Sequence, residues 1–160
     1  MKEKLIFIYF GDYWDERWRR RQQLAYHLSQ KHEVEKVIYV ELPASIPELA
    51  KSMLGIAEPG IKERWARIIK SKMRMTEGKI DIVTPFCFLS VYRYNAKWDK
   101  VFLKKITVYA IKKILKNYDS KNNLILWVSH PFAVEYIGEF GETKLCYDCT
   151  EKFSEFKEWN

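Results

Sequence analysis

The chain has 160 residues, of which 48% are hydrophobic and 31% charged, and its formal net charge at pH 7 is +7. This length and apolar content suffice for one domain with its own core, and they exclude a disordered or fibrous chain. The basic excess favours an anionic partner, such as nucleic acid, an acidic membrane surface or a phosphorylated substrate, without choosing among them.

Short apolar runs alternate with helical patterns along the chain. Runs rich in Ile, Val, Tyr and Phe predict strands at residues 5–10, 37–41, 80–84, 124–129 and 144–148. Helical spacing predicts helices at residues 15–30, 46–54, 61–74, 99–118 and 132–140. This alternation is typical of a parallel sheet with helices on both faces. We therefore expect residues 1–160 to form a single α/β domain, an open Rossmann-like sheet with strand order 3-2-1-4-5.

The N-terminal residues predict neither export nor a membrane span. The apolar run at 5–10 is shorter than the core of a signal peptide and leads into the charged stretch 12–21. No stretch approaches the roughly 20 apolar residues that cross a bilayer. We expect a cytoplasmic protein, and peripheral attachment to the inner face of the cell membrane remains open.

The cysteines predict neither a disulfide framework nor a metal site. Cys87, Cys146 and Cys149 are an odd number in a chain with no export signal. The pair Cys146 and Cys149 lacks the two further ligands of a zinc site and does not open a helix as a redox motif would. We expect reduced thiols and no bound metal.

The expected strand order places a ligand crevice between the first and fourth strands, where the order reverses at their carboxyl ends. The loops 11–14 and 129–131 flank this crevice. A G-x-G-x-x-G motif does not follow the first strand, which is followed by Gly11 alone. We therefore expect no dinucleotide cofactor, and no other cofactor is indicated.

Three sequence blocks near the predicted strand ends match one family in order. They are G-D-Y-W-D with W-R-R-R-Q-Q-L in 11–24, I-L-W-V-S-H-P in 125–131, and Y-D-C, an acidic residue, F-S and F in 147–156. Together they resemble the N-terminal half of bacterial two-domain GT-B glycosyltransferases of the teichuronic-acid-biosynthesis type, similar to glycosyltransferase family 4. Thr150-Glu151-Lys152 departs from the family's more usual acidic pair, and the arginines at 17–21 match it only approximately.

The resemblance implies a function in polysaccharide biosynthesis. The chain would be the acceptor-side domain of a transferase that moves a sugar from a nucleotide-sugar donor to a cell-surface polysaccharide or lipid-linked acceptor. A C-terminal domain outside this chain would hold most of the donor, so the fragment alone would be inactive. The resemblance also suggests a retaining reaction, in which the leaving phosphate can accept the acceptor's proton, and we assign no catalytic residue.

Two arginines of the first predicted helix are candidate ligand contacts. A helix beginning near residue 15 places Arg21 within the apolar face and Arg17 at its border. A buried arginine needs a partner. That partner is either an internal acid, with Asp148 and Glu41 the best-placed candidates, or an anionic ligand in the crevice. Arg20 points elsewhere on the helix, although the preceding turn can bring it near the crevice rim.

The remaining candidate residues end the first, fourth and fifth strands. His130 precedes a proline at the start of a predicted helix and is either structural or a substrate contact; the resemblance implies a histidine near the sugar here. Asp148 can accept hydrogen bonds from sugar hydroxyls, act as a base or pair with Arg21, and we favour the pair. The predicted substrate-binding residues are Gly11, Asp12, Arg17, Arg21, His130 and Asp148.

The pattern at 61–74 predicts a basic amphipathic helix. Its basic residues suit an anionic membrane surface, with Arg64, Arg67 and Lys70 as the expected lipid contacts. The alternative is that Trp65 and the isoleucines pack on the sheet while the basic side chains are merely solvated. A rival to the transferase is a non-catalytic basic module that binds nucleic acid or an anionic membrane. The transferase interpretation itself involves no nucleic acid.

Overall fold

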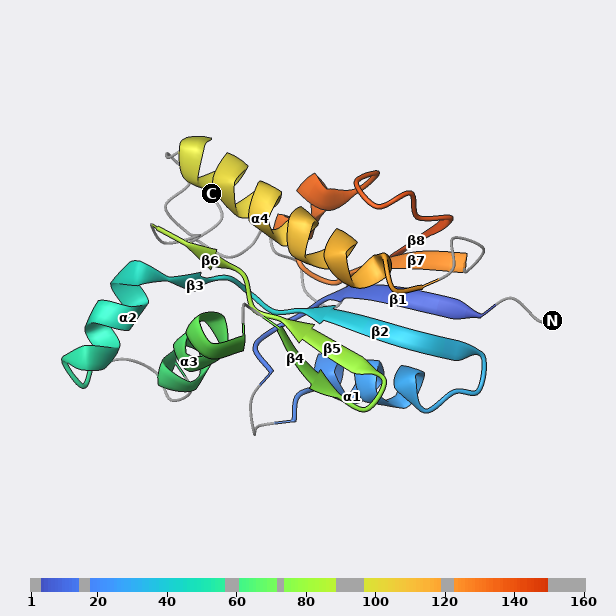
Figure 1. Ribbon diagram of the computed structural model, residues 1–160, viewed down its shortest axis with the longest axis horizontal. Coiled ribbons are helices and arrows are strands. Elements are labelled where there is room, and N and C mark those ends of the chain that lie inside the picture. Colours follow the sequence, from blue (N-terminus) through green and yellow to red (C-terminus); the bar gives the residue numbers. More distant parts are fainter. Residues whose placement is uncertain are drawn as a thin grey trace.

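The computed structural model is an α/β fold with a mainly parallel, mixed sheet (Figure 1), and it describes residues 4–14, 18–56, 61–71, 74–88, 97–118 and 123–149. The strands are β1 (Leu5–Phe10), β2 (Val34–Val40), β3 (Ala44–Ser45), β4 (Arg74–Glu77), β5 (Ile80–Val83), β6 (Phe86–Cys87), β7 (Asn123–Val128) and β8 (Lys144–Tyr147). The helices are α1 (Arg20–Ser29), α2 (Ile46–Met53), α3 (Ile61–Ser71), α4 (Lys97–Leu115) and the 3-10 helix η1 (Pro131–Tyr136).

The main sheet has six strands in the order β4-β5-β2-β1-β7-β8. Neighbours from β5 to β8 pair in parallel, and β4 pairs antiparallel with β5 at the edge. The order therefore differs from the expected 3-2-1-4-5, because β4 extends the sheet. Its sequence, R-M-T-E, contains one apolar residue and gives no strand signal. A further pair of two-residue strands, β3 and β6, forms a separate parallel sheet.

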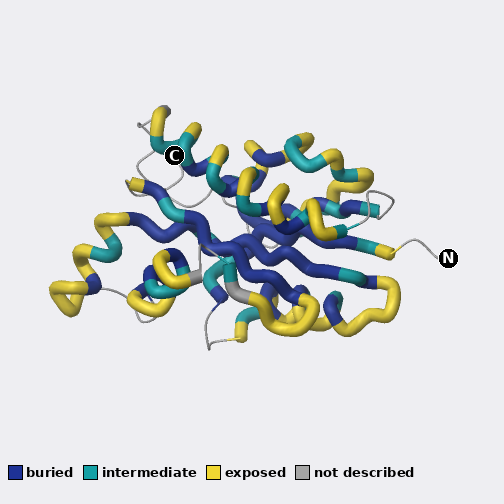
Figure 2. Tube along the Cα trace, viewed as in Figure 1, coloured by how far each residue is buried: buried dark blue, intermediate teal, exposed yellow. Residues whose placement is uncertain are grey.

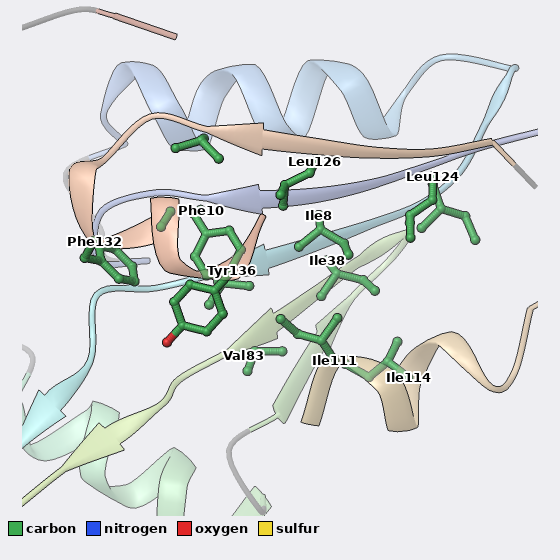
Figure 3. Close-up of a cluster of buried hydrophobic side chains, with 14 residues drawn as sticks. Ile8, Phe10, Ile38, Val83, Ile111, Ile114, Leu124, Leu126, Phe132 and Tyr136 are labelled. Atoms are coloured by element: carbon green, nitrogen blue, oxygen red, sulfur yellow. The ribbon is translucent and has the colours of Figure 1, made fainter. Parts of the chain in front are cut away.

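Helices cover both faces of the main sheet. In β1, Ile6, Ile8 and Phe10 lie on the face that packs against α4 and η1 (Figure 3), while Phe7 and Tyr9 lie on the face covered by α1. This alternation follows from the two-residue period of a strand. Burial on both sides makes the central strands the core of the molecule (Figure 2).

Three elements differ from their predicted form. The first helix begins at Arg20 rather than at 15, because Trp18 has a left-handed backbone (φ 47°) and Arg19 is extended. The region 132–140 forms the short 3-10 helix η1 rather than a longer α-helix. The fifth predicted strand, β8, lies at the sheet edge, so Leu145 and Tyr147 are exposed rather than buried.

The helices α2 and α3 lie with the β3–β6 pair beyond the carboxyl ends of β2 and β5 (Figure 1). Ile61, Trp65 and Ile68 of α3 form a small core with Ala44 and the ring of Phe86. The apolar face of α3 therefore packs on the protein, as the alternative interpretation of this helix expected, although on the small sheet rather than the main one. None of the described helices is both long and apolar enough to cross a membrane.

Candidate functional site at the carboxyl ends of the central strands

The site lies where β2, β1, β7 and β8 end side by side. Phe10 is in register with Val128, so Gly11 and Ser129 both follow the last paired residues of β1 and β7. The Gly11 amide donates to the Val40 carbonyl (3.0 Å), and the Ser129 hydroxyl donates to the Phe10 carbonyl (2.6 Å). The first bond ties the end of β1 to β2, and the second ties the end of β7 to β1. The first and fourth predicted strands are neighbours, as expected.

Gly11 is required by a close approach rather than by its backbone angles. A Cβ atom at this position would lie 2.3 Å from the Tyr39 hydroxyl oxygen and 2.6 Å from ring carbon Cζ. The Tyr39 ring is fully buried, stacks on Tyr9 (centroids 5.5 Å apart) and meets the edge of Trp14 (4.9 Å). Because this ring is packed against two others, its displacement would disturb both contacts.

Tyr9 and Tyr39 bring two polar atoms into the base of this site. Burial raises the pKa of Tyr9 to about 12 and the pKa of Tyr39 well above its usual value. Neither hydroxyl makes a regular hydrogen bond to any part of the chain that the structure describes, although Ser129 lies close enough to Tyr9 to offset part of the burial effect on its pKa. Both phenols stay protonated at neutral pH, so they can donate a hydrogen bond but not act as bases.

Arg21 pairs with Asp12, not with either acid that the sequence suggested. Its Nη1 lies 2.5 Å from the Asp12 Oδ1, and both side chains are largely buried. Because α1 starts only at residue 20, Arg21 stands in its first turn, where it meets Asp12, which follows β1 closely. Asp12 and Arg21, both predicted to bind substrate, are thus adjacent, and their contact with a ligand stays a prediction. Arg17 lies outside the described residues.

Asp148 instead pairs with Arg20, whose two guanidinium nitrogens donate to the two carboxylate oxygens at 2.9 and 3.1 Å. The expected Arg21–Asp148 pair is therefore wrong. The Asp148 amide also donates to the Val128 carbonyl (2.8 Å), which fixes this residue at the end of β7. The bidentate contact joins residues 128 positions apart in the chain and raises the pKa of the exposed Arg20.

His130 caps the start of η1 from the end of β7. Its Nδ1 accepts from the Phe132 amide (3.4 Å), so a neutral ring carries its proton on Nε2. Burial first, and the positive charge of Arg21 second, lower the pKa of His130 to about 4. At neutral pH the imidazole is uncharged. It can donate a hydrogen bond to a hydroxyl group but offers no positive charge to a phosphate.

Glu41, the other acid suggested for Arg21, is fully buried and belongs to a different network. Its carboxylate accepts from the Trp14 amide (2.6 Å), from Nη2 of Arg67 (2.8 and 3.0 Å) and from the Thr84 hydroxyl. Several donors offset the cost of burying the charge. Glu41 therefore ties the crevice loop at Trp14 to α3 and to the end of β5.

The predicted membrane-binding residues separate into two groups. Arg64 is buried, donates to the Leu42 carbonyl (2.8 Å) and lies over the Tyr13 ring (3.7 Å). Arg67 binds Glu41, and only Lys70 is exposed. The two arginines therefore hold α3 against the crevice loop, and substituting them would test folding rather than lipid contact.

The buried tyrosine pair and the inward position of Arg64 and Arg67 were not predicted from the sequence. A signal for Arg64 was present, because helical spacing puts it on the same face as Ile61, Trp65 and Ile68. No comparable signal marks Arg67, which stands at the border of that face. The last part of the third sequence block, beyond residue 149, lies outside the described residues.

The arrangement is a polar cluster at the ends of adjacent strands, made of the neutral imidazole of His130 and two ion pairs, with the Tyr9 and Tyr39 hydroxyls fully buried. A neutral imidazole suits hydroxyl-rich ligands, and the arginines suit carboxylate or phosphate. None of the three cysteines forms a disulfide bond, and the described residues contain no group of side chains suited to hold a metal ion. Comparison of the chain with protein-family models, curated proteins and solved structures finds no match.

Proposed function

We propose that this chain is the N-terminal, acceptor-side half of a GT-B glycosyltransferase with a Rossmann-like sheet. It would act in polysaccharide biosynthesis at the cytoplasmic side of the membrane. The enzyme would transfer a sugar from a nucleotide-sugar to a cell-surface polysaccharide or lipid-linked acceptor. The C-terminal half, outside the chain, would hold the nucleotide.

The observation that carries the proposal is the physical joining of the first and third sequence blocks. Arg20 belongs to the first block and Asp148 to the third, and they form a bidentate ion pair. Asp12 and Arg21, both of the first block, pair next to His130 of the second. Motifs recognised separately in the sequence thus converge on one end of one sheet, where open α/β sheets bind ligands.

In the proposed enzyme each residue type has a distinct task. The neutral imidazole of His130 would donate to a sugar hydroxyl. Asp12 and Asp148 would accept from further hydroxyls, and the arginines would orient these carboxylates or an anionic group on the acceptor. Because catalysis takes place between two domains, the groups that stabilise the leaving diphosphate would come from the other half.

The test combines binding and turnover. A calorimetric screen of nucleotide-sugars against the isolated chain should find weak binding or none, and no transfer. In the longer enzyme, His130→Ala should lower kcat/KM, while substitution of His32, an exposed histidine in the turn between α1 and β2, by alanine should not. Arg21→Ala should lower both activity and stability, because it leaves Asp12 buried without its partner.

Two results would contradict the proposal. Micromolar nucleotide-sugar affinity with catalysis by the chain alone would make it a complete enzyme of another kind. Salt-sensitive binding of nucleic acid with no transfer by the longer protein would favour the basic module instead.

A further inference from the structure

The helix α2 and the turn after it expose several apolar side chains to solvent. Its buried or half-buried side is formed by Glu48, Leu49 and Ser52, and Glu48 accepts from the Ser45 amide (2.9 Å) in a capping box. Leu49 packs against the small core of α3, whereas Ile46 and Met53 are exposed. The exposed side of α2 and the turn after it consist of Ile46, Pro47, Ala50, Lys51, Met53, Leu54, Gly55 and Ile56.

The exposure of this apolar face is extensive. Met53, Leu54 and Ile56 are 79%, 73% and 74% exposed. Figure 2 shows most of α2 as exposed, and Figure 1 shows that it lies at one end of the molecule, beyond the carboxyl ends of the strands. Contiguous apolar side chains in such a position mark an interaction surface.

We propose that this α2 face, Met53, Leu54 and Ile56 with Ile46, inserts into the surface of an anionic lipid bilayer. The surface protrudes, whereas small-molecule sites are concave, so a small ligand does not suit it. An apolar tip beside cationic side chains is the pattern of a segment that lies in a membrane interface.

The charges around the α2 face favour an anionic bilayer over a second copy of this chain. Lys51 on α2 and Lys62 and Lys70 on the adjoining α3 are exposed. Within these two helices, as far as the structure describes their side chains, Glu63 is the one exposed acid. A second copy, which also carries a net charge of +7, would bring these lysines against their own counterparts. Anionic headgroups complement the lysines while the acyl region receives the apolar tip. Because Arg64 and Arg67 are occupied inside the protein, this surface differs from the one that the sequence predicted.

The α2 face shares no residue with the candidate site at the strand ends, and its binding to a bilayer does not depend on sugar transfer. Its test measures co-sedimentation of the 160-residue chain with vesicles of phosphatidylcholine alone and with phosphatidylglycerol added. The chain should bind the anionic vesicles, and salt should weaken binding. The variant Met53→Ser/Leu54→Ser/Ile56→Ser should reduce the partition coefficient at least about tenfold. Lys51→Gln and Lys70→Gln, which remove one positive charge each, should each lower the partition coefficient about fivefold.

The matched control acts on α4, another helix with exposed aromatic and basic residues. Tyr109 and Lys105 are exposed on α4, and Lys116 is exposed directly after it. Tyr109→Ser and Lys105→Gln/Lys116→Gln should leave vesicle binding within about twofold, because α4 runs away from the end of the molecule where α2 lies (Figure 1), and salt screens exposed charges more than a Debye length from the bilayer. All altered side chains are solvent-exposed, so unchanged melting temperatures would verify that each variant folds.

Any one of four outcomes would overturn the proposal. The first would be failure of the wild-type chain to bind anionic vesicles, and the second would be binding of the α2 serine variant as strong as that of the wild type. The third would be loss of binding in the α4 variants while the α2 variants keep it. The fourth would be a dimer, detected by light scattering and abolished in the α2 serine variant, without vesicle binding; it would assign the face to a second copy.

Discussion

Replacing Gly11 by alanine should destabilise the protein through a single buried clash. The new Cβ would lie 2.3, 2.6 and 2.9 Å from three atoms of Tyr39, whose ring is held between Tyr9 and Trp14. Overpacking of this kind costs about 1–3 kcal/mol, and the rigid surroundings favour the upper end. Chemical denaturation of the single variant measures the loss.

A second substitution separates this clash from the ordinary effect of losing a glycine. Tyr39→Phe alone should be nearly neutral or stabilising, because the hydroxyl it removes has no partner among the described residues. It should relieve Gly11→Ala only partly, since Cζ remains 2.6 Å from the new Cβ. Tyr39→Leu should rescue more, with a coupling energy of about 1 kcal/mol or more.

The control for this cycle is Gly138→Ala. Gly138 has a φ of 84° and open space around its Cβ position, so its substitution strains the backbone without touching Tyr39. Its cost should therefore add to that of Tyr39→Leu with no coupling. The reasoning is refuted if Gly11→Ala changes stability by less than about 0.5 kcal/mol, or if its cost is equally additive.

Three further predictions concern the charged groups of the site. The pKa of His130 is lowered to about 4 in the folded protein, against an ordinary value of 6.5. Between these two pH values the unfolded chain binds the proton and the folded one does not, so lowering the pH from 6.5 to 4 should reduce the free energy of unfolding by about 3 kcal/mol. Stability measured between these pH values should fall less steeply in His130→Gln. Glu41→Gln should cost about 3 kcal/mol or more, because it leaves the Arg67 guanidinium without its anion, and a change below 1 kcal/mol would refute the network. Arg20→Ala should change stability little, since Arg20 is exposed, yet it should shift the NMR amide signal of Asp148; an unmoved signal would mean that the pair does not persist in solution.

The strands and most helices were predictable from local pattern. Runs such as 5–10 are apolar because both faces of a central strand are buried, and α2 begins at the expected residue because Ser45 and Glu48 form a capping box. The edge elements were not predictable in the same way. β4 has a polar sequence, and β8 is apolar yet exposed. At an edge, backbone pairing rather than burial defines the strand.

The place of the site was predictable, but its partners were not. Strand adjacency brings Gly11, His130 and Asp148 to one end of the sheet, and that follows from topology. Which carboxylate meets which arginine depends on where α1 starts, and the left-handed turn at Trp18 has no sequence signal such as a glycine. The geometry of the loop before α1 therefore decides which ion pairs form, and the hydrophobic periodicity of the sequence does not predict that geometry.

The central claim is that the three sequence blocks form one saccharide site, and amide NMR of the isotope-labelled chain tests it most directly. Titration with a panel of acidic and neutral oligosaccharides, and with nucleotide-sugars, would follow the amides of Gly11, Asp12, His130 and Asp148 together. One saccharide should shift all four signals along a common binding curve, while nucleotide-sugars should shift them weakly or not at all. Shifts confined to one block, or tight nucleotide-sugar binding with turnover by this chain alone, would contradict it.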